Sequence, residues 1–397
     1  MRIAILTYLY NEMISYVYEL FPNLNKLNYL DQKKIIDNNI SIWASGWESA
    51  LEEQKISVMT IPTNMPYFLR KWAEENGSKH TEKNQIIVEM LKKFLPDIFL
   101  YDLHYDDLFD QIKANLNTIK MVVLWKGSPP VNMEIFKKVD LTISCAPEEV
   151  KSLRGMGFKI EHLHHAFNKN ILNGQLQANK EFELIFIGQI YRAIGFHTDR
   201  DRMLKQIVKE MEINVFSPSY ELGFSDFLYH LAKKSALTLL LPFYFISDKF
   251  SNKYSIKLEK AREYQFFPYS LKFKKSLHPA GYEKKMYDVI RSSKDVLNIH
   301  ADSSPQFAFN MKLFETTGVG SCLLTDWKEN INQLFEEDEE IVTYRSPEEC
   351  VQKAKWLLAN SKERGIIAKK GQQRTFASHL YEHRVPEFLS IIKKHLE

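Results

Sequence analysis

Residues 310–349, NMKLFETTGVGSCLLTDWKENINQLFEEDEEIVTYRSPEE, decide the fold that we expect for the whole chain. Apolar residues first recur at helical spacing, and Gly318 and Gly320 then separate this helix from a short apolar strand at residues 321–324. A second helix, an acidic turn, a strand at residues 340–344 and a capped helix follow. This succession predicts one edge of a doubly wound α/β domain, in which a ligand binds beyond the carboxyl ends of the strands.

The same alternation of strands and helices runs through most of the chain, so the sheets should be mainly parallel. The pattern lapses at residues 168–180, which are polar and lack a sustained apolar period, and we place an interdomain linker with few contacts there. Residues 242–275 also lack a clean period and are interpreted as an insertion. Outside the first stretch, we expect strands at residues 2–7, 56–61, 97–101, 121–125, 141–144, 159–164, 182–188, 213–216 and 296–300.

The composition is typical of a soluble globular protein. The 397 residues suffice for two domains, and 45% of them are hydrophobic and 26% charged. A net charge of +3 does not favour nucleic acid as a partner. Three widely spaced cysteines form no disulfide framework, which favours a reducing cytoplasm. The first ten residues are too short and are followed by too polar a stretch for a signal peptide, and the apolar run 236–245 is shorter than the ~20 residues that span a bilayer. The sequence therefore predicts no membrane-spanning segment, and peripheral contact with a membrane is the one kind of membrane association that we still consider.

Several motifs together resemble one enzyme family. Glu315 followed by Gly320 is similar to the donor-binding helix of GT-B glycosyltransferases. The runs FETTGVGSCLLTDW and EEIVTYRSPEE, with GWESALEEQ, NMPYFLRKWAEENG, LHHAF and NIH elsewhere, resemble the glycosyltransferase group 1-like proteins of the CgeB/YkvP type. One departure concerns the position eight before Glu315, which is Phe307. Many retaining GT-B enzymes carry a second Glu there, so a retaining outcome is not carried over to this chain.

The resemblance implies an α/β, GT-B-like fold, with two Rossmann-like domains whose mainly parallel sheets face each other across a cleft. Residues 1–167 would form the acceptor-side domain and residues 181–380 the domain that binds a nucleotide sugar. Residues 381–397 would form a C-terminal helix that crosses back to the N-terminal domain.

The donor site is expected on the second domain. A carboxylate at Glu315 can accept both ribose hydroxyls in charge-assisted hydrogen bonds. The departing diphosphate gains negative charge and needs cations or helix N-termini, for which Lys312 and Arg192 are the candidates. The complete set of predicted donor-site residues is Arg192, Asn298, Asn310, Lys312, Glu315, Thr316, Gly318 and Gly320.

Histidines near strand ends are the candidate catalytic residues: His165 and His104 in the first domain and His300 in the second, with Asp102 competing for the role of base. Asp199 and Asp201 have the spacing of a metal-binding motif from another glycosyltransferase fold. They are explained more simply as caps of the helix that follows. We therefore expect no metal and no cofactor besides the donor substrate.

These observations predict a metal-independent glycosyltransferase that moves a sugar from a nucleoside diphosphate sugar to a hydroxyl of a glycan, a lipid-linked saccharide or a protein. Two alternatives stay open. A nucleotide-sugar epimerase or hydrolase of the same fold would use the same donor site, and a noncatalytic saccharide-binding assembly factor would need no chemistry. The absence of a Gly-rich phosphate loop and of a dinucleotide fingerprint weakens the kinase and dehydrogenase interpretations.

Overall fold

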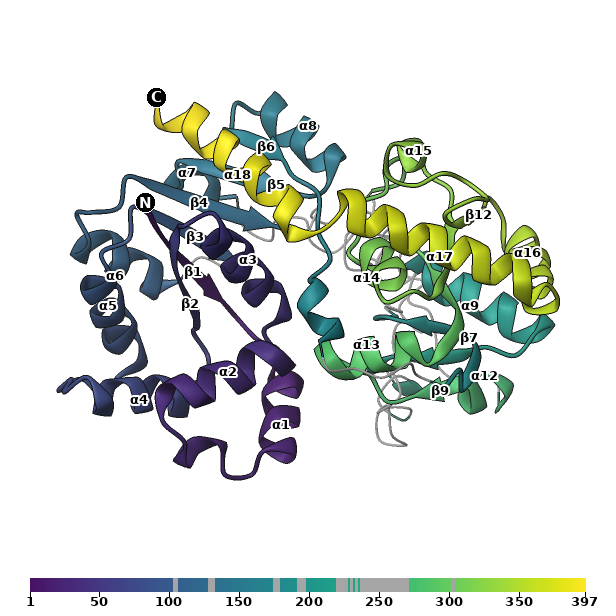
Figure 1. The fold of residues 1–397 in the computed structure, drawn as a ribbon, viewed down its shortest axis with the longest axis horizontal. Coiled ribbons are helices and arrows are strands. Elements are labelled where there is room, and N and C mark those ends of the chain that lie inside the picture. The colour runs from purple at the N-terminus through teal and green to yellow at the C-terminus, as the bar shows by residue number, and fades with distance from the viewer. Residues whose placement is uncertain are drawn as a thin grey trace.

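The protein contains two six-stranded sheets in which every recorded strand pair is parallel (Figure 1). The first sheet has the order β2-β1-β3-β4-β5-β6 and the second β12-β11-β10-β7-β8-β9. A computed structural model describes residues 1–102, 106–127, 133–173, 179–190, 198–218, 228, 231–232, 235, 271–300 and 304–397.

The N-terminal half alternates strands with helices, as the sequence predicts. Its strands are β1 (Arg2–Thr7), β2 (Ser57–Pro62), β3 (Ile98–Asp102), β4 (Met121–Lys126), β5 (Leu141–Ser144) and β6 (Ile160–His162). Its helices are α1 (Asn11–Leu20), η1 (Leu24–Lys26), α2 (Tyr29–Asn39), α3 (Ile42–Glu53), α4 (Pro66–Glu75), α5 (Lys83–Phe94), α6 (Asp107–Asn115), α7 (Ile135–Lys138) and α8 (Pro147–Gly155).

The strands of the first sheet have continuous apolar sequences because both faces of the sheet are buried. In β1 the alternate residues Ala4 and Leu6 join the core under α1, α2, α4, α5 and α6. Ile3 and Ile5 join the core on the opposite face, under α3 and the C-terminal helix α18 (Tyr381–Leu396). Successive side chains of a strand point to opposite faces, so a strand with helices on both sides needs apolar residues at every position.

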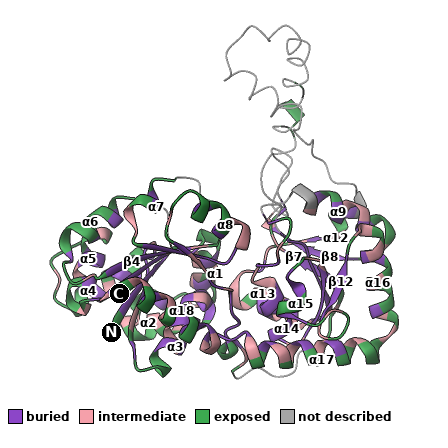
Figure 2. Cartoon of the chain, turned by 90° about the horizontal axis from the view of Figure 1, so that it is seen from above, coloured by how far each residue is buried: buried purple, intermediate pink, exposed green. Residues whose placement is uncertain are grey.

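The C-terminal half repeats this architecture. Its strands are β7 (Phe182–Ile187), β8 (Asn214–Phe216), β9 (Leu277–His278), β10 (Ser293–Asn298), β11 (Cys322–Asp326) and β12 (Val342–Tyr344). Its described helices are α9 (Thr198–Glu210), α12 (Leu271–Ser276), α13 (Glu283–Arg291), α14 (Lys312–Gly318), α15 (Ile331–Leu334), α16 (Pro347–Ala359) and α17 (Ser361–Ser378). The predicted cap of α16 is confirmed, because the Ser346 hydroxyl accepts from the Glu349 N–H at 3.1 Å. Figure 2 shows the buried strands between helices whose outer faces are exposed.

The last helix packs on the N-terminal sheet rather than on its own half (Figure 1). α17 and α18 are separated by His379 and Leu380, and α18 then lies against α3. The Trp47 ring centroid lies 5.3 Å from those of both Tyr381 and Phe388. The chain therefore passes between the two halves twice, once at β6–β7 and once at α17–α18.

Two expectations need correction, and one strand was not predicted. The segment that begins at Asn168 does not run free of contacts: residues Lys169–Leu172 form the 3-10 turn η2, and the buried Asn168 side chain donates to the Ile42 carbonyl at 3.0 Å. Strand β9 pairs with β8 although only two residues form it, which is too short for a sequence period to reveal. The amphipathic helix expected after Asp326 is reduced to the four residues of α15. Most of the predicted insertion 242–275 lies outside the described residues.

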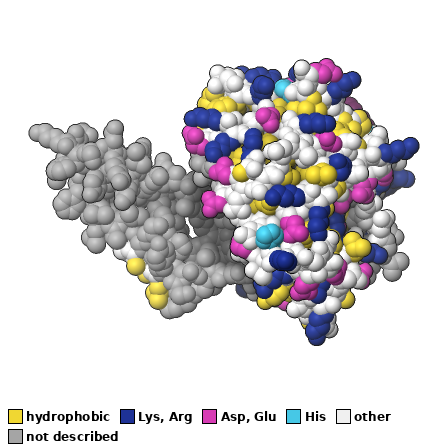
Figure 3. All heavy atoms as spheres, turned by 90° about the vertical axis from the view of Figure 1, so that its left-hand side faces the viewer, with side chains coloured by type: hydrophobic (Ala, Val, Ile, Leu, Met, Phe, Trp, Pro, Cys, Tyr) yellow, Lys and Arg dark blue, Asp and Glu magenta, His cyan; other side chains and the backbone are white. Residues whose placement is uncertain are grey.

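The surface carries both signs of charge. Figure 3 shows the outer face of the N-terminal half, where Lys and Arg side chains are interspersed with Asp and Glu. None of the helices in the described part of the chain has the length and apolar character needed to cross a bilayer.

Candidate functional site

The carboxyl edges of the two sheets face each other. Phe309, in the segment that connects β10 to α14, forms an apolar cluster with Cys145 and Ala146, which follow β5. Ligands of doubly wound folds bind at carboxyl edges, so this is where the predicted site residues should meet.

Asn298 and Asn310 join the end of β10 to the entrance of α14. The Asn310 amide donates to Asn298 Oδ1 at 2.7 Å, and the Asn298 amide donates to Thr325 Oγ1 at 2.9 Å. The Tyr344 hydroxyl donates to the Asn298 carbonyl at 2.7 Å. The structure thus brings the two predicted asparagines together, and these bonds align three strand ends with the helix.

His300 forms a dyad with a carboxylate that sequence reasoning missed. Its Nδ1 lies 2.7 Å from Asp326 Oδ1, and its backbone N–H donates to the same oxygen at 3.0 Å. Burial opposes ionisation of Asp326, but His300 and Lys328 outweigh it and lower the pKa of Asp326 to about 2. The Asp326 carboxylate accepts hydrogen bonds from both the Nδ1 side and the backbone N–H of His300, and these contacts fix the orientation of the imidazole ring. Nε2 is buried and has no hydrogen-bond partner among the described residues.

Glu315 lies in the first turn of α14 and is 5% exposed. Its Oε1 accepts from the Tyr287 hydroxyl at 3.2 Å, and its Oε2 lies 2.8 Å from the Lys312 ammonium. Lys312 also lies 2.9 Å from Met286 Sδ. Lys312 therefore directs its charge to Glu315 rather than standing alone as a phosphate ligand, and Tyr287 is a partner of Glu315 that sequence reasoning did not find.

The two glycines and Thr316 have packing roles in this structure. A Cβ on Gly318 would lie 2.4 Å from Cγ of the buried Phe167, and Gly320 adopts a φ of +80° at the turn into β11. Thr316 is fully buried, and its hydroxyl has no partner among the described residues. Their part in donor binding stays a prediction.

The N-terminal side contributes two candidate proton acceptors. Asp102 ends β3 and is half-buried, and burial raises its pKa to about 7 against the opposing charge of Lys126. The His165 ring packs against Trp125 in a tilted arrangement, with centroids 5.7 Å apart and the ring planes at 55°. Burial, with the nearby charges of His162 and Arg384, lowers the pKa of His165 to about 3, so its imidazole is neutral near pH 7. His104 and Arg192 lie outside the described residues.

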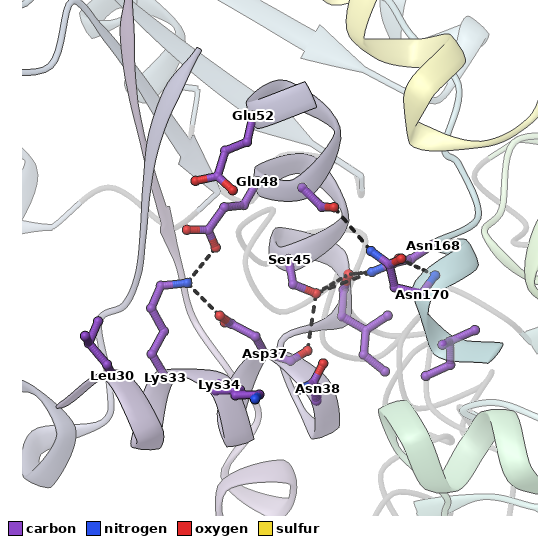
Figure 4. Close-up of a pocket in the computed structure, with 13 residues that line it drawn as sticks. Leu30, Lys33, Lys34, Asp37, Asn38, Ser45, Glu48, Glu52, Asn168 and Asn170 are labelled. Atoms are coloured by element: carbon purple, nitrogen blue, oxygen red, sulfur yellow. Dashed lines mark hydrogen bonds and ion pairs between the residues drawn. The ribbon is translucent and has the colours of Figure 1, made fainter. Parts of the chain in front are cut away.

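A polar pocket of about 370 Å³ lies elsewhere, between α2, α3 and η2 (Figure 4). Lys33 points between Asp37 and Glu48, and its ammonium lies 2.6 Å from a carboxylate oxygen of each. Asn168 and Asn170 line the other side. None of the predicted site residues that the structure describes borders this pocket. Among the described residues, no group of three His, Cys, Asp or Glu is placed to hold a metal ion.

Comparison with known proteins supports a glycosyltransferase-like fold. Residues 257–390 match the family model described as glycosyl transferase-like. A glycosyltransferase from Rickettsia africae ESF-5 aligns over 100% of this chain and 98% of its own, with 8% identity and a TM-score of 0.54. AviGT4, a glycosyltransferase involved in avilamycin A biosynthesis, aligns over 100% of this chain and 98% of its own, with 11% identity and a TM-score of 0.54. Sucrose-phosphate synthase from Thermosynechococcus elongatus aligns over 99% and 98%, with 9% identity and a TM-score of 0.50. No curated protein matches the chain in sequence. The predicted GT-B-like fold is therefore confirmed.

Proposed function

We propose that the protein is a glycosyltransferase that moves a sugar from a nucleoside diphosphate sugar to a hydroxyl of a glycan, a lipid-linked saccharide or a protein. One observation carries the proposal: the glycosyltransferase-like match contains a buried Glu315 in the first turn of a helix that starts at the carboxyl edge of a GT-B-like sheet. Within this class, the CgeB/YkvP type and a cytoplasmic location remain predictions.

In this proposal Glu315 binds the ribose of the donor. A carboxylate has about four lone-pair sites, so Glu315 can keep its ion pair with Lys312 while it accepts two ribose hydroxyls in place of Tyr287. The nearby Lys312 would also lower the cost of bringing a diphosphate to this edge of the sheet. Arg192 remains the second predicted phosphate ligand.

The transfer step requires a base for the acceptor hydroxyl. The hydroxyl oxygen forms a bond to the anomeric carbon, the bond from that carbon to the diphosphate oxygen breaks, and the hydroxyl proton passes to a protein group. Asp102 is suited to this because a pKa of about 7 makes a carboxylate basic enough to take the proton near neutrality. His165 and His104 on the acceptor side, and His300 with its unpartnered Nε2, are the other candidates.

Negative charge grows on the diphosphate as its bond to the sugar breaks. We propose that protein cations and helix N-termini stabilise this charge without a metal ion. The residues that support this part of the proposal are Lys312, at the start of α14, and Arg192, which follows β7 in the sequence.

The test is the nucleotide affinity of Glu315→Gln. Calorimetric titration with uridine, guanosine, adenosine and cytidine diphosphates should identify which nucleobase the wild-type protein prefers. Glu315→Gln should then bind that nucleotide more weakly by roughly 1–3 kcal/mol, the scale of a hydrogen bond to a charged group. Glu363→Gln, on the exposed surface of α17, is the matched control and should bind like the wild type.

Unchanged affinity in a folded Glu315→Gln variant would remove this residue from the donor site. Product analysis then separates the functions. Transfer that needs an added acceptor supports the transferase, whereas sugar release or epimerisation without an acceptor supports the alternative enzymes. Nucleotide-independent saccharide binding would indicate an assembly factor.

A further inference from the structure

A carboxylate of the N-terminal half lies against backbone amides of the C-terminal half. Glu148, in the first turn of α8, accepts at Oε1 from the N–H groups of Gln306 and Phe307, both at 3.0 Å. The hydroxyl of the buried Ser304 lies within hydrogen-bond distance of both Oε2 and the Phe307 carbonyl, the latter at 2.8 Å, and its one proton can be donated to either. Glu148 forms no ion pair among the described residues, and because it is half-buried its charge is stabilised by these donors together with solvent.

The three donors form a cradle for an oxyanion, defined by Ser304 Oγ and the N–H groups of Gln306 and Phe307. Two N–H groups that converge on one oxygen, with a hydroxyl on a second, are the donor set by which backbone loops bind carboxylates and phosphates. The Lys328 ammonium stands beside this loop, 2.9 Å from the Pro305 carbonyl and 3.3 Å from Asp326. Its positive charge is thus shared with the Asp326 carboxylate.

The C-terminal half holds the cradle in shape without help from Glu148. The Gln306 carbonyl accepts from the Glu329 N–H at 2.9 Å. The Asn330 side chain accepts from the Ala308 N–H at 2.6 Å and donates to the Ala308 carbonyl at 3.0 Å. The cradle is thus built by one half of the molecule, and the carboxylate inside it comes from the other.

The position of the cradle connects it with the donor. It lies in the segment between β10 and α14, directly before the helix that carries Lys312 and Glu315. A nucleotide whose ribose binds Glu315 would lie at the same carboxyl edge of the sheet as this segment.

We propose that the cradle binds a phosphate oxygen of the donor and that Glu148 competes with the donor for it. This inference rests on the proposed function. In this structure the Glu148 carboxylate holds the two halves together at the cradle, and a diphosphate that enters must displace it. Glu148 therefore weakens donor affinity and couples donor binding to movement of the two halves.

The test compares wild type, Glu148→Ala and Glu148→Gln in calorimetric titrations with inorganic pyrophosphate and with the four nucleoside diphosphates. Glu148→Ala empties the cradle and should bind these anions roughly tenfold more tightly. Glu148→Gln keeps the shape and an accepting oxygen but loses the charge, so its gain should be smaller. Glu363→Gln again serves as the charge-matched control and should show no gain.

A second substitution assigns the gain to the cradle. Adding Ser304→Ala to Glu148→Ala removes one of the three donors and should reverse part of the gain. A gain that is unchanged by Ser304→Ala would overturn the assignment, because it would arise elsewhere.

The outcomes also separate this inference from the proposed function. If the wild type binds a nucleoside diphosphate and the folded Glu148 variants bind it equally or more weakly, competition by Glu148 is wrong while the donor site stands. If neither the wild type nor the variants bind any of the probes, both the inference and the proposed function are wrong.

Discussion

Gly318→Ala tests whether the glycine that ends α14 serves packing between the two halves. Gly318 is the last residue of α14, and a Cβ on it would lie 2.4, 2.5 and 2.6 Å from Cγ, Cδ1 and Cδ2 of Phe167. The Phe167 ring cannot easily retreat, because the residue is fully buried and its N–H donates to the His379 carbonyl at 2.8 Å. An added methyl group must therefore push the ring or the helix.

The sign of the effect distinguishes packing from helix propensity. Replacing an unconstrained helical glycine by alanine should stabilise the protein by up to about 1 kcal/mol. Forcing an extra carbon into a close-packed contact costs about 1–3 kcal/mol. Because Gly318 ends its helix, the propensity gain is small, and we expect Gly318→Ala to destabilise the protein by about 1–2 kcal/mol.

The assay is urea and thermal unfolding of variants measured together. Gly365→Ala is the matched control, because it changes a helical glycine with no atom within 4 Å of the added carbon, and it should stabilise the protein. Phe167→Ala removes all three atoms that the added carbon would meet, so the double variant with Gly318→Ala should lose less stability than the sum of the single losses. If Gly318→Ala stabilises the protein as Gly365→Ala does, the packing explanation is refuted.

Three further predictions concern catalysis, acid stability and the polar pocket. His165→Ala should slow transfer to the acceptor while leaving nucleoside diphosphate affinity unchanged in titrations; loss of that affinity would place the donor on the N-terminal half. Burial lowers the pKa of His379 from 6.5 to about 4, so between these values the unfolded chain binds a proton that the folded protein does not. Thermal unfolding at several pH values should therefore show the wild type losing stability relative to His379→Gln as the pH falls through this interval, and a pH-independent difference would contradict the reasoning. Lys33→Met leaves Asp37 and Glu48 without their shared cation and should lower the unfolding free energy by ~1–3 kcal/mol. Lys33→Arg keeps a cation there and should retain most of the wild-type unfolding free energy. Equal stability of the two variants in urea would show that the ion pairs contribute nothing.

The candidate site could be predicted where its residues lie close together in the chain. The end of β10 and the start of α14 carry Asn298, His300 and Asn310, and polar side chains that follow an apolar strand are a local signal of its carboxyl edge. Their partners could not be predicted in the same way. Asp326 is the last residue of a different strand, and its pairing with His300 depends on β10 and β11 lying side by side in parallel register.

Sequence by itself determined the two parallel sheets, most element positions and the capped helix at Ser346, because apolar periods and capping residues act over a few neighbours. Only the tertiary structure decided that Glu148 enters the cradle at Phe307, that Phe167 lies on Gly318, and that Asn168 is buried rather than part of a free linker. Each of these contacts joins segments that lie far apart in the chain, with no periodic signal in either segment. They exist because the chain crosses between its halves twice, which brings together surfaces whose complementarity is a matter of shape and charge in three dimensions.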